Sequence, residues 1–188
     1  MTASANVSSM HTRIPEALVG SLENASSIIR DWADVVLIGP GLTDDDETRS
    51  FVRDVLAKWR GPVVVDAGAI SAFDGDVGAL GATLRGRPAI ITPHPGELAK
   101  LIGRDVRYVL DNRFDIGIEM ARELGAAVLL KGTPTVVSAP DGSRYVSAAG
   151  TQVLATGGAG DALGGIVATL LAQGCAPAVA AGCAAWVH

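Results

Sequence analysis

The sequence has few aromatic residues, only two cysteines and no excess of basic charge. Trp, Tyr and Phe together make up 4% of the 188 residues, whereas 48% are hydrophobic and 23 are glycine. This composition is typical of a layered α/β protein, in which helices rich in small residues cover buried strands. The net charge of −5 argues against a broad surface for nucleic acid or anionic membrane. The net charge does not exclude phosphate ligands, because backbone N–H groups can bind them without a basic patch.

The low cysteine content excludes two further classes of protein. Cys175 and Cys183 form neither a zinc-binding pattern nor a disulfide framework. We expect both to be small core residues, and we expect a reducing, cytoplasmic location. The first six residues lack the charged and apolar segments of a secretory signal. The uncharged stretch 162–187 is long enough to suggest a membrane span, but Gly174 and Pro177 interrupt it, so we predict two buried helices instead.

Four short apolar runs predict the strands of a parallel sheet, at residues 35–38, 63–65, 89–91 and 128–130. Each run is continuous rather than alternating, as expected for strands that are covered on both faces. Helical patterns lie between them, most clearly at 44–59 and 112–124. Strands alternating with helices predict a three-layer α/β fold, a mostly parallel sheet with helices on both faces. Two further segments, 135–138 and 144–147, flank a Pro-Asp-Gly turn and predict a β-hairpin.

The strongest chemical signal is the glycine-rich segment Gly157-Gly158-Ala159-Gly160-Asp161, directly before an apolar helix. Its free N–H groups and the positive end of the helix predict an anion site. Asp161 could accept a proton from a hydroxyl that attacks a phosphoryl group, or it could simply cap the helix.

Other polar residues follow the remaining predicted strands, at the edge where parallel sheets bind ligands. His94, between two prolines, either faces this edge or is an exposed loop residue. Glu97 either favours the dipole of a first helical turn or holds magnesium through water. Lys131 either is a solvated charge or, as we expect at the end of a buried strand, points into the cleft. Asp66 leaves capping, metal and water contacts open. The segment 39–41, Gly-Pro-Gly, is either a plain turn or a backbone surface for a bulky ligand.

Three common site motifs are absent from the sequence: a Walker-type phosphate loop, a Gly-x-Gly-x-x-Gly fingerprint and a Gly-x-Ser-x-Gly elbow. With its motifs in order, the chain resembles the ribokinase-like superfamily. Within it, the chain is most similar to the ADP-dependent NAD(P)H-hydrate dehydratases, the carboxy-terminal domain of bifunctional nicotinamide nucleotide repair proteins. The likeness rests on Ile38-Gly39-Pro40-Gly41-Leu42, Val65-Asp66-Ala67, Thr92-Pro93-His94-Pro95-Gly96-Glu97, Lys131-Gly132-Thr133-Pro134-Thr135 and Thr156-Gly157-Gly158-Ala159-Gly160-Asp161.

The resemblance implies a repair reaction, in which ADP or ATP phosphorylates the ring hydroxyl of hydrated NADH or NADPH and phosphate then leaves. It implies that Gly41, His94 and Asp161 bind the substrate, with Asp161 also acting as the catalytic base. It assigns the adenine nucleotide to a second set of residues, namely Lys131, Gly132, Thr133, Pro134, Thr135 and Gly160. Mg²⁺ is expected to shield the phosphates, with no residue assigned to it. Ala159 departs from the family, since many relatives have Ser there.

The resemblance runs from about residue 13 to residue 188. We therefore expect residues 1–12 to be a disordered tail and residues 13–188 to be a single ribokinase-like domain, truncated at both ends relative to the family. Such truncation would expose apolar surface, so a homo-oligomer is expected. Two alternatives remain: a ribokinase-like kinase acting on a sugar or vitamin precursor, and a non-catalytic nucleotide-binding remnant.

Overall fold

A computed structural model describes residues 7–14, 16–22, 25–148, 150 and 156–188 of the chain. These residues divide into two compact units, residues 1–33 and residues 34–188. The first unit contains the helices α1 (Val7–Arg13) and α2 (Ala25–Trp32). Helix α1 occupies part of the segment expected to be a disordered tail. The extent of a single domain over residues 13–188 stays a prediction.

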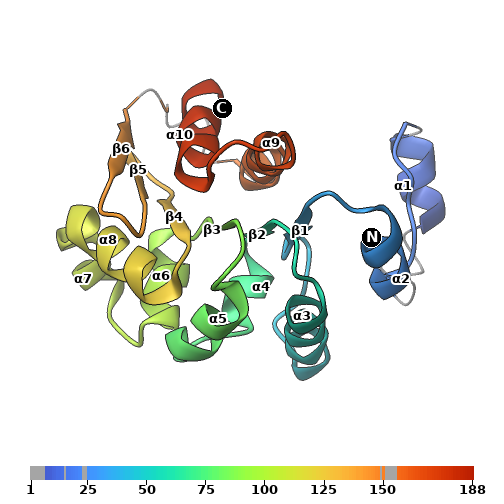
Figure 1. The fold of residues 1–188 in the computed structure, drawn as a ribbon, viewed down its shortest axis with the longest axis horizontal. Helices are drawn as coiled ribbons and strands as arrows, with labels where there is room; N and C mark the ends of the chain where they lie inside the picture. Colours follow the sequence, from blue (N-terminus) through green and yellow to red (C-terminus); the bar gives the residue numbers. More distant parts are fainter. Residues whose placement is uncertain (1–6, 15, 23–24, 149, 151–155) are drawn as a thin grey trace. The chain divides into compact units, whose positions relative to one another are not determined.

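The second unit is built on one six-stranded sheet, with the strands in the order β1-β2-β3-β4-β5-β6 (Figure 1). The strands are β1 (Val36–Ile38), β2 (Val63–Val65), β3 (Ala89–Ile91), β4 (Ala127–Leu130), β5 (Thr135–Ser138) and β6 (Arg144–Ser147). The first four strands are parallel, and β5 and β6 continue the sheet as an antiparallel hairpin. The predicted strands and hairpin are therefore confirmed.

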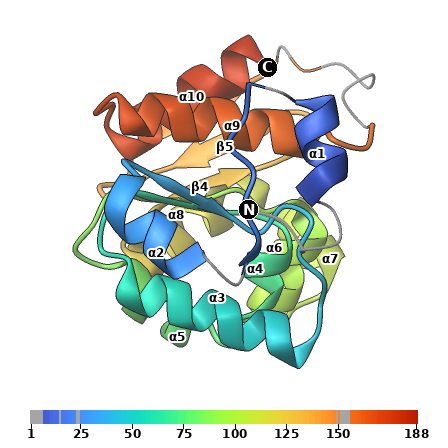
Figure 2. The ribbon, with the colours of Figure 1, turned by 90° about the vertical axis from the view of Figure 1, so that its right-hand side faces the viewer.

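Helices cover both faces of this sheet, as the continuous apolar strands require. One face carries α9 (Ala159–Ala172) and α10 (Pro177–Val187), and the other carries the remaining helices of the unit (Figures 1 and 2). These are α3 (Asp46–Lys58), α4 (Gly68–Ser71), α5 (Val77–Leu84), α6 (Pro95–Leu101), α7 (Val106–Asp111) and α8 (Arg113–Leu124). The three-layer α/β architecture predicted from the sequence is confirmed.

The core beneath α9 and α10 is made of alternate strand residues, because successive strand side chains point to opposite faces. Val64, Ile90, Leu129 and Val137 form one cluster with small and branched residues of both helices. Its helical members are Leu163, Val167, Ala168, Leu171, Ala180, Ala181 and Ala184. The small alanines of α10 let this helix lie close to the sheet. The uncharged stretch is thus two packed helices, and no helix in the described part of the chain is long and apolar enough to span a membrane.

Local signals explain the helix boundaries on the other face. The side chain of Asp45 caps α3 by accepting a hydrogen bond from Thr48 N, and Gly125 ends α8 with a left-handed backbone, φ 65°. At the other end of α3, the guanidinium of Arg87 donates to the carbonyl oxygens of Leu56 and Trp59. Burial, followed by the nearby charge of Arg60, lowers the pKa of Arg87. Its cation faces the negative end of the α3 dipole, which is favourable.

The central strand β4 carries a first prediction. Leu129 is fully buried between the two helix layers, whereas Leu110 on α7 is 46% exposed. We expect Leu129→Ala to lower the free energy of unfolding by about 2–5 kcal/mol, through lost apolar burial and the cavity left behind. The matched variant Leu110→Ala should lower it by about 0.5 kcal/mol or less. Urea denaturation of both variants measures the difference, and equal losses would contradict this description of the core.

Candidate active site

The carboxyl ends of the four parallel strands meet at one edge of the sheet, and the loops that leave them stay bonded to neighbouring strands. Asp66 N donates to Ile38 O (3.0 Å), Thr92 N to Val65 O (3.1 Å) and Lys131 N to Pro93 O (2.9 Å). The hydrogen-bond pattern of the sheet therefore extends by one residue past the ends of β2, β3 and β4. These backbone hydrogen bonds hold the main chain of Asp66 and of Lys131, from which the two side chains extend.

His94 and Glu97 form a capping box at the start of α6. Nδ1 of His94 accepts hydrogen bonds from Gly96 N (3.0 Å) and Glu97 N (3.2 Å), while His94 N donates to Glu97 Oε2 (2.7 Å). The His94 side chain is 56% exposed and its Nε2 lies 3.4 Å from Glu97 Oε1. His94 is thus both a helix cap and an accessible site residue. Glu97 lies in the first helical turn, as expected, and it also fixes the loop before the helix.

Lys131 points toward the strand edge and pairs with carboxylates from two other elements. Its Nζ lies 2.8 Å from Asp66 Oδ1 and 3.9 Å from Glu97 Oε2. Asp66 is 2% exposed, so this pair is largely shielded from water. The side chains of His94, Glu97, Lys131 and Asp66 therefore form one connected series. We call these four residues the edge series.

The glycine-rich segment forms the start of α9 at the same edge. Gly158 is the N-cap in a left-handed conformation, φ 89°, and as a glycine it has no side chain to cap the helix. Asp161 lies in the first turn and is exposed, so the proposed alternative of a simple capping role is not what the structure shows. A Cβ placed on Gly160 would lie 3.7 Å from Nζ of Lys131. The first turn of α9 is thus next to the lysine, and the start of a helix favours anions.

The loop of residues 131–134 connects β4 to β5. Its Thr133–Pro134 peptide bond is cis, and Thr135 Oγ1 donates to Gly132 O (2.9 Å). Arg113 at the start of α8 donates to the carbonyl oxygen of Pro134. Sequence reasoning missed Arg113, because a basic residue at a helix end carries no local sign of a distant carbonyl partner.

The turn after β1 places two glycines with different surroundings. Gly39 has φ 125°, and a Cβ there would lie 1.7 Å from the carbonyl oxygen of Asp66. Gly41 has φ 72°, but its Cβ position meets no atom within 4 Å. The backbone of Gly39 thus approaches the neighbouring strand end, whereas Gly41 is exposed.

A pocket of about 500 Å³ lies beside His94. It is lined by the turn after β1, the starts of α4 and α6, and the α6–α7 connection, through Leu42, Asp44, Ala67, Gly68, Ser71, His94, Gly96, Glu97, Ala99, Lys100, Arg104, Asp105 and Val106. Lys100 and Arg104 are the cations of this lining, and the sequence analysis did not identify them. Lys100 lies in the last turn of α6 and Arg104 in the connection that follows, where basic residues are common without any ligand.

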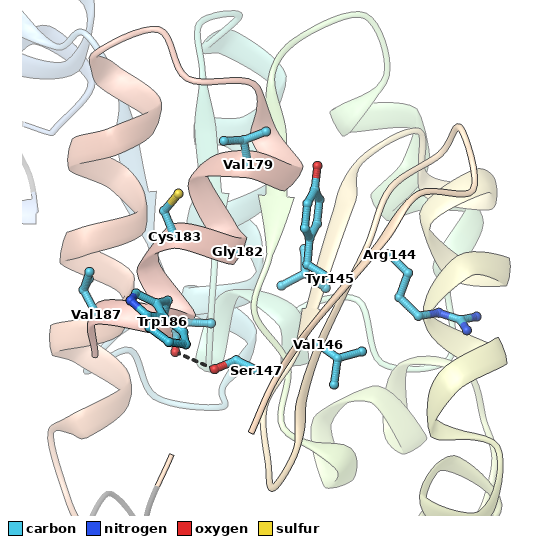
Figure 3. A pocket seen from close by; sticks show the side chains of 11 residues that line it. Arg144, Tyr145, Val146, Ser147, Val179, Gly182, Cys183, Trp186 and Val187 are labelled. Atoms are coloured by element: carbon cyan, nitrogen blue, oxygen red, sulfur yellow. Dashed lines mark hydrogen bonds between the residues drawn. The ribbon is translucent and has the colours of Figure 1, made fainter. Parts of the chain in front are cut away.

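A second pocket, of about 530 Å³, lies away from this edge between α10 and β6 (Figure 3). Its lining is mostly apolar and includes Tyr145, which packs against Gly182, and the exposed Val146 and Trp186. Cys183 also lines it and is exposed, so the expectation that both cysteines are core residues is wrong for Cys183. Cys175 is partly buried and packs against the core beneath α9 and α10. Neither cysteine forms a disulfide.

Comparisons with known proteins identify the family. A sequence profile of the NAD(P)H-hydrate dehydratases matches residues 1–188. The chain belongs to the NAD(P)H-hydrate dehydratase family. It is 34% identical to the ADP-dependent (S)-NAD(P)H-hydrate dehydratase of Xanthomonas campestris over 198 residues, covering 100% of this chain and 66% of that protein. It is 43% identical over 155 residues to the bifunctional NAD(P)H-hydrate repair enzyme Nnr of Moorella thermoacetica, covering 82% of this chain and 29% of that enzyme.

Solved structures agree with this family assignment. The crystal structure of the ADP/ATP-dependent NAD(P)H-hydrate dehydratase from Bacillus subtilis, co-crystallised with ATP and Mg²⁺, matches with a TM-score of 0.82 and 29% identity. The match covers 100% of this chain and 66% of that chain. A ribokinase-like superfamily protein from Enterococcus faecalis matches with a TM-score of 0.78. The fold is therefore ribokinase-like, and the chain spans about 30% of the length of the bifunctional repair enzymes that it matches.

The two glycines after β1 both have a positive φ, but only Gly39 is crowded, so substitutions at the two positions can be compared. Gly41→Ala should lower the free energy of unfolding by about 1–2 kcal/mol, the cost of a left-handed backbone for a non-glycine residue. Gly39→Ala should cost roughly 4 kcal/mol or more, since its Cβ must also displace the Asp66 carbonyl. Urea denaturation measures both losses. A Gly39→Ala loss no larger than that of Gly41→Ala would contradict the close approach of the two strand ends.

Proposed function

We propose that this chain catalyses the dehydration of hydrated NADH or NADPH, with ADP or ATP as the phosphoryl donor. The observation that carries the proposal is the placement of Lys131 between the start of α9 and the edge of the His94 pocket. A cation next to the start of a helix suits a phosphate, and the adjacent pocket suits a second ligand. The named activity of the Xanthomonas and Bacillus relatives supports the same reaction.

The proposed reaction converts a poor leaving group into a good one. The hydroxyl oxygen of the hydrated ring attacks the terminal phosphorus, and the bond from that phosphorus to the bridging oxygen breaks, which releases AMP from ADP or ADP from ATP. The hydroxyl proton passes to a base. Phosphate then leaves with the electrons of its carbon–oxygen bond, and the adjacent ring carbon loses a proton, which restores the double bond.

The proposed roles follow the residues carried over from the family. Asp161, exposed in the first turn of α9, is the catalytic base that accepts the hydroxyl proton and also binds the substrate. Gly41 and His94 bind the hydrated dinucleotide. The nucleotide is bound by Gly160 at the helix start together with the strand-end segment Lys131, Gly132, Thr133, Pro134 and Thr135.

Mg²⁺ fits this site as an ion bound chiefly through the nucleotide. Among the described residues, no group of three or more His, Cys, Asp or Glu side chains could form a protein cage for a metal. Mg²⁺ usually keeps several waters and takes one or two carboxylates plus substrate phosphates. Glu97, at 13% exposure and next to Lys131, is the carboxylate that would hold it. When bound, the ion would neutralise charge on the phosphates.

Asp161→Asn tests the catalytic role. The change removes the base but keeps the size of an exposed side chain, so we expect a loss of roughly 10²–10⁴-fold in turnover, with ADP binding kept. Turnover is followed by the return of NADH absorbance from hydrated NADH with Mg²⁺ and ADP or ATP. Asp115→Asn is the matched control, since Asp115 is the exposed first-turn acid of α8. Full activity of Asp161→Asn would refute the assigned base, and accumulation of a phosphorylated product would indicate a kinase.

The proposal extends to a homo-oligomer and to a cytoplasmic location. The exposed apolar residues Tyr145, Val146, Trp186 and Val187 gather on β6 and the end of α10, beside the pocket in Figure 3. Apolar patches of this kind support self-association. The two free thiols are compatible with a reducing compartment.

We expect Val146→Lys to shift the protein toward the monomer, because a charge on this surface would have to be buried in the assembly. Light scattering after size-exclusion chromatography measures the mass. Leu110→Lys, at a similarly exposed position on α7, should leave it unchanged. A monomeric wild type, or equal masses for all three proteins, would overturn the assignment of this surface.

A further inference from the structure

Asp66 is a buried carboxylate for which the proposed reaction has no role. It follows β2 directly, is 2% exposed and is covered on its carbonyl side by the backbone of Gly39. Within the described part of the chain, the partner of its side chain is Nζ of Lys131, at 2.8 Å. A buried charge is costly unless it is paired, so the contact with Lys131 compensates the burial of the Asp66 carboxylate.

Lys131 depends on Asp66 for its position. A lysine ammonium is a point charge on a flexible four-carbon stem, and its location is set by its partners rather than by its own geometry. The stronger of its two contacts is with Asp66, because Glu97 lies 3.9 Å away and already accepts a hydrogen bond from His94 N. Without Asp66, Glu97 would be the remaining anionic partner among the described residues.

The location set by this pair is directly under α9. The Cβ position of Gly160 is 3.7 Å from Lys131 Nζ, and that of Gly164 is 3.9 Å from Asp66 Oδ2. The ion pair therefore lies against the first two turns of the helix, and Gly164 leaves room for the carboxylate. Phosphate that binds at the start of α9 would meet an ammonium already held in place.

We propose that Asp66 is a positioning residue, whose buried carboxylate holds Lys131 beneath the start of α9 and thereby sets the affinity for the phosphates of the adenine nucleotide. The inference rests on the proposed function for the identity of the nucleotide. The two carboxylates of the edge series then have different roles: Asp66 orients Lys131, and Glu97 remains available to the loop of His94 and to Mg²⁺.

A double-mutant cycle with Asp66→Asn and Lys131→Gln tests this role. The probe is ADP with Mg²⁺, measured by calorimetry, together with kcat and the separate KM values for ADP and hydrated NADH. Asp66→Asn should weaken ADP binding roughly 10- to 100-fold, the size of a lost charge-assisted contact. The KM for hydrated NADH should stay within about twofold. In the Lys131→Gln background, Asp66→Asn should cause no further loss of ADP affinity.

The control separates positioning from general damage to the fold. Thr92→Val changes a fully buried polar residue at the neighbouring strand end, and we expect it to lower stability while ADP affinity is kept. Additive losses in the cycle, or equal losses for Thr92→Val, would overturn the proposal. If Asp66→Asn does not fold, the double variant is compared with Lys131→Gln, and any further loss of ADP affinity refutes the proposal.

The ADP-binding part of the cycle can be measured without turnover. A wild-type protein that binds ADP but does not restore NADH would refute the proposed function, while the binding cycle would still decide the role of Asp66. A wild-type protein that does not bind ADP would refute both.

Discussion

The parallel pairing of β1 to β4 is the constraint on which the site depends. Because these strands run in one direction, every connection that leaves a carboxyl end begins at the same edge of the sheet. Residues from distant parts of the sequence, such as Asp66 and Lys131, are thereby brought to 2.8 Å. The helices on one face and the α9–α10 layer on the other keep strands β2, β3 and β4 buried.

The fold was predictable from the sequence where residue type and hydrophobic periodicity indicate the same secondary structure. The runs at 63–65 and 89–91 were predictable as strands. Each is short and rich in β-branched residues, and turn-forming or polar residues follow it directly. The hairpin followed from its Pro-Asp-Gly turn. The short helices α4, α5 and α7 were not identified individually, because segments of four to eight residues show too little periodicity and form through packing.

The location of the candidate site was predictable from the sequence, but the contacts between its side chains were not. The sequence places His94, Lys131 and Asp161 at one edge, since each follows a strand or begins a helix there. It contains no sign that Lys131 is held by Asp66, that Arg113 donates to the Pro134 carbonyl, or that Lys100 and Arg104 line the pocket. These contacts depend on crossover helices whose exact rotation is set by core packing.

The capping box at α6 has a consequence for what His94 can offer a ligand. Its Nδ1 accepts two backbone N–H groups, so in the neutral ring this nitrogen carries no hydrogen. The hydrogen must then be on Nε2, which lies 3.4 Å from Glu97 Oε1, so the ring nitrogen that does not cap the helix is a donor. The helix cap therefore determines which tautomer of the neutral His94 ring is present. A molecule recognised by His94 must therefore present an acceptor, such as an amide or phosphate oxygen.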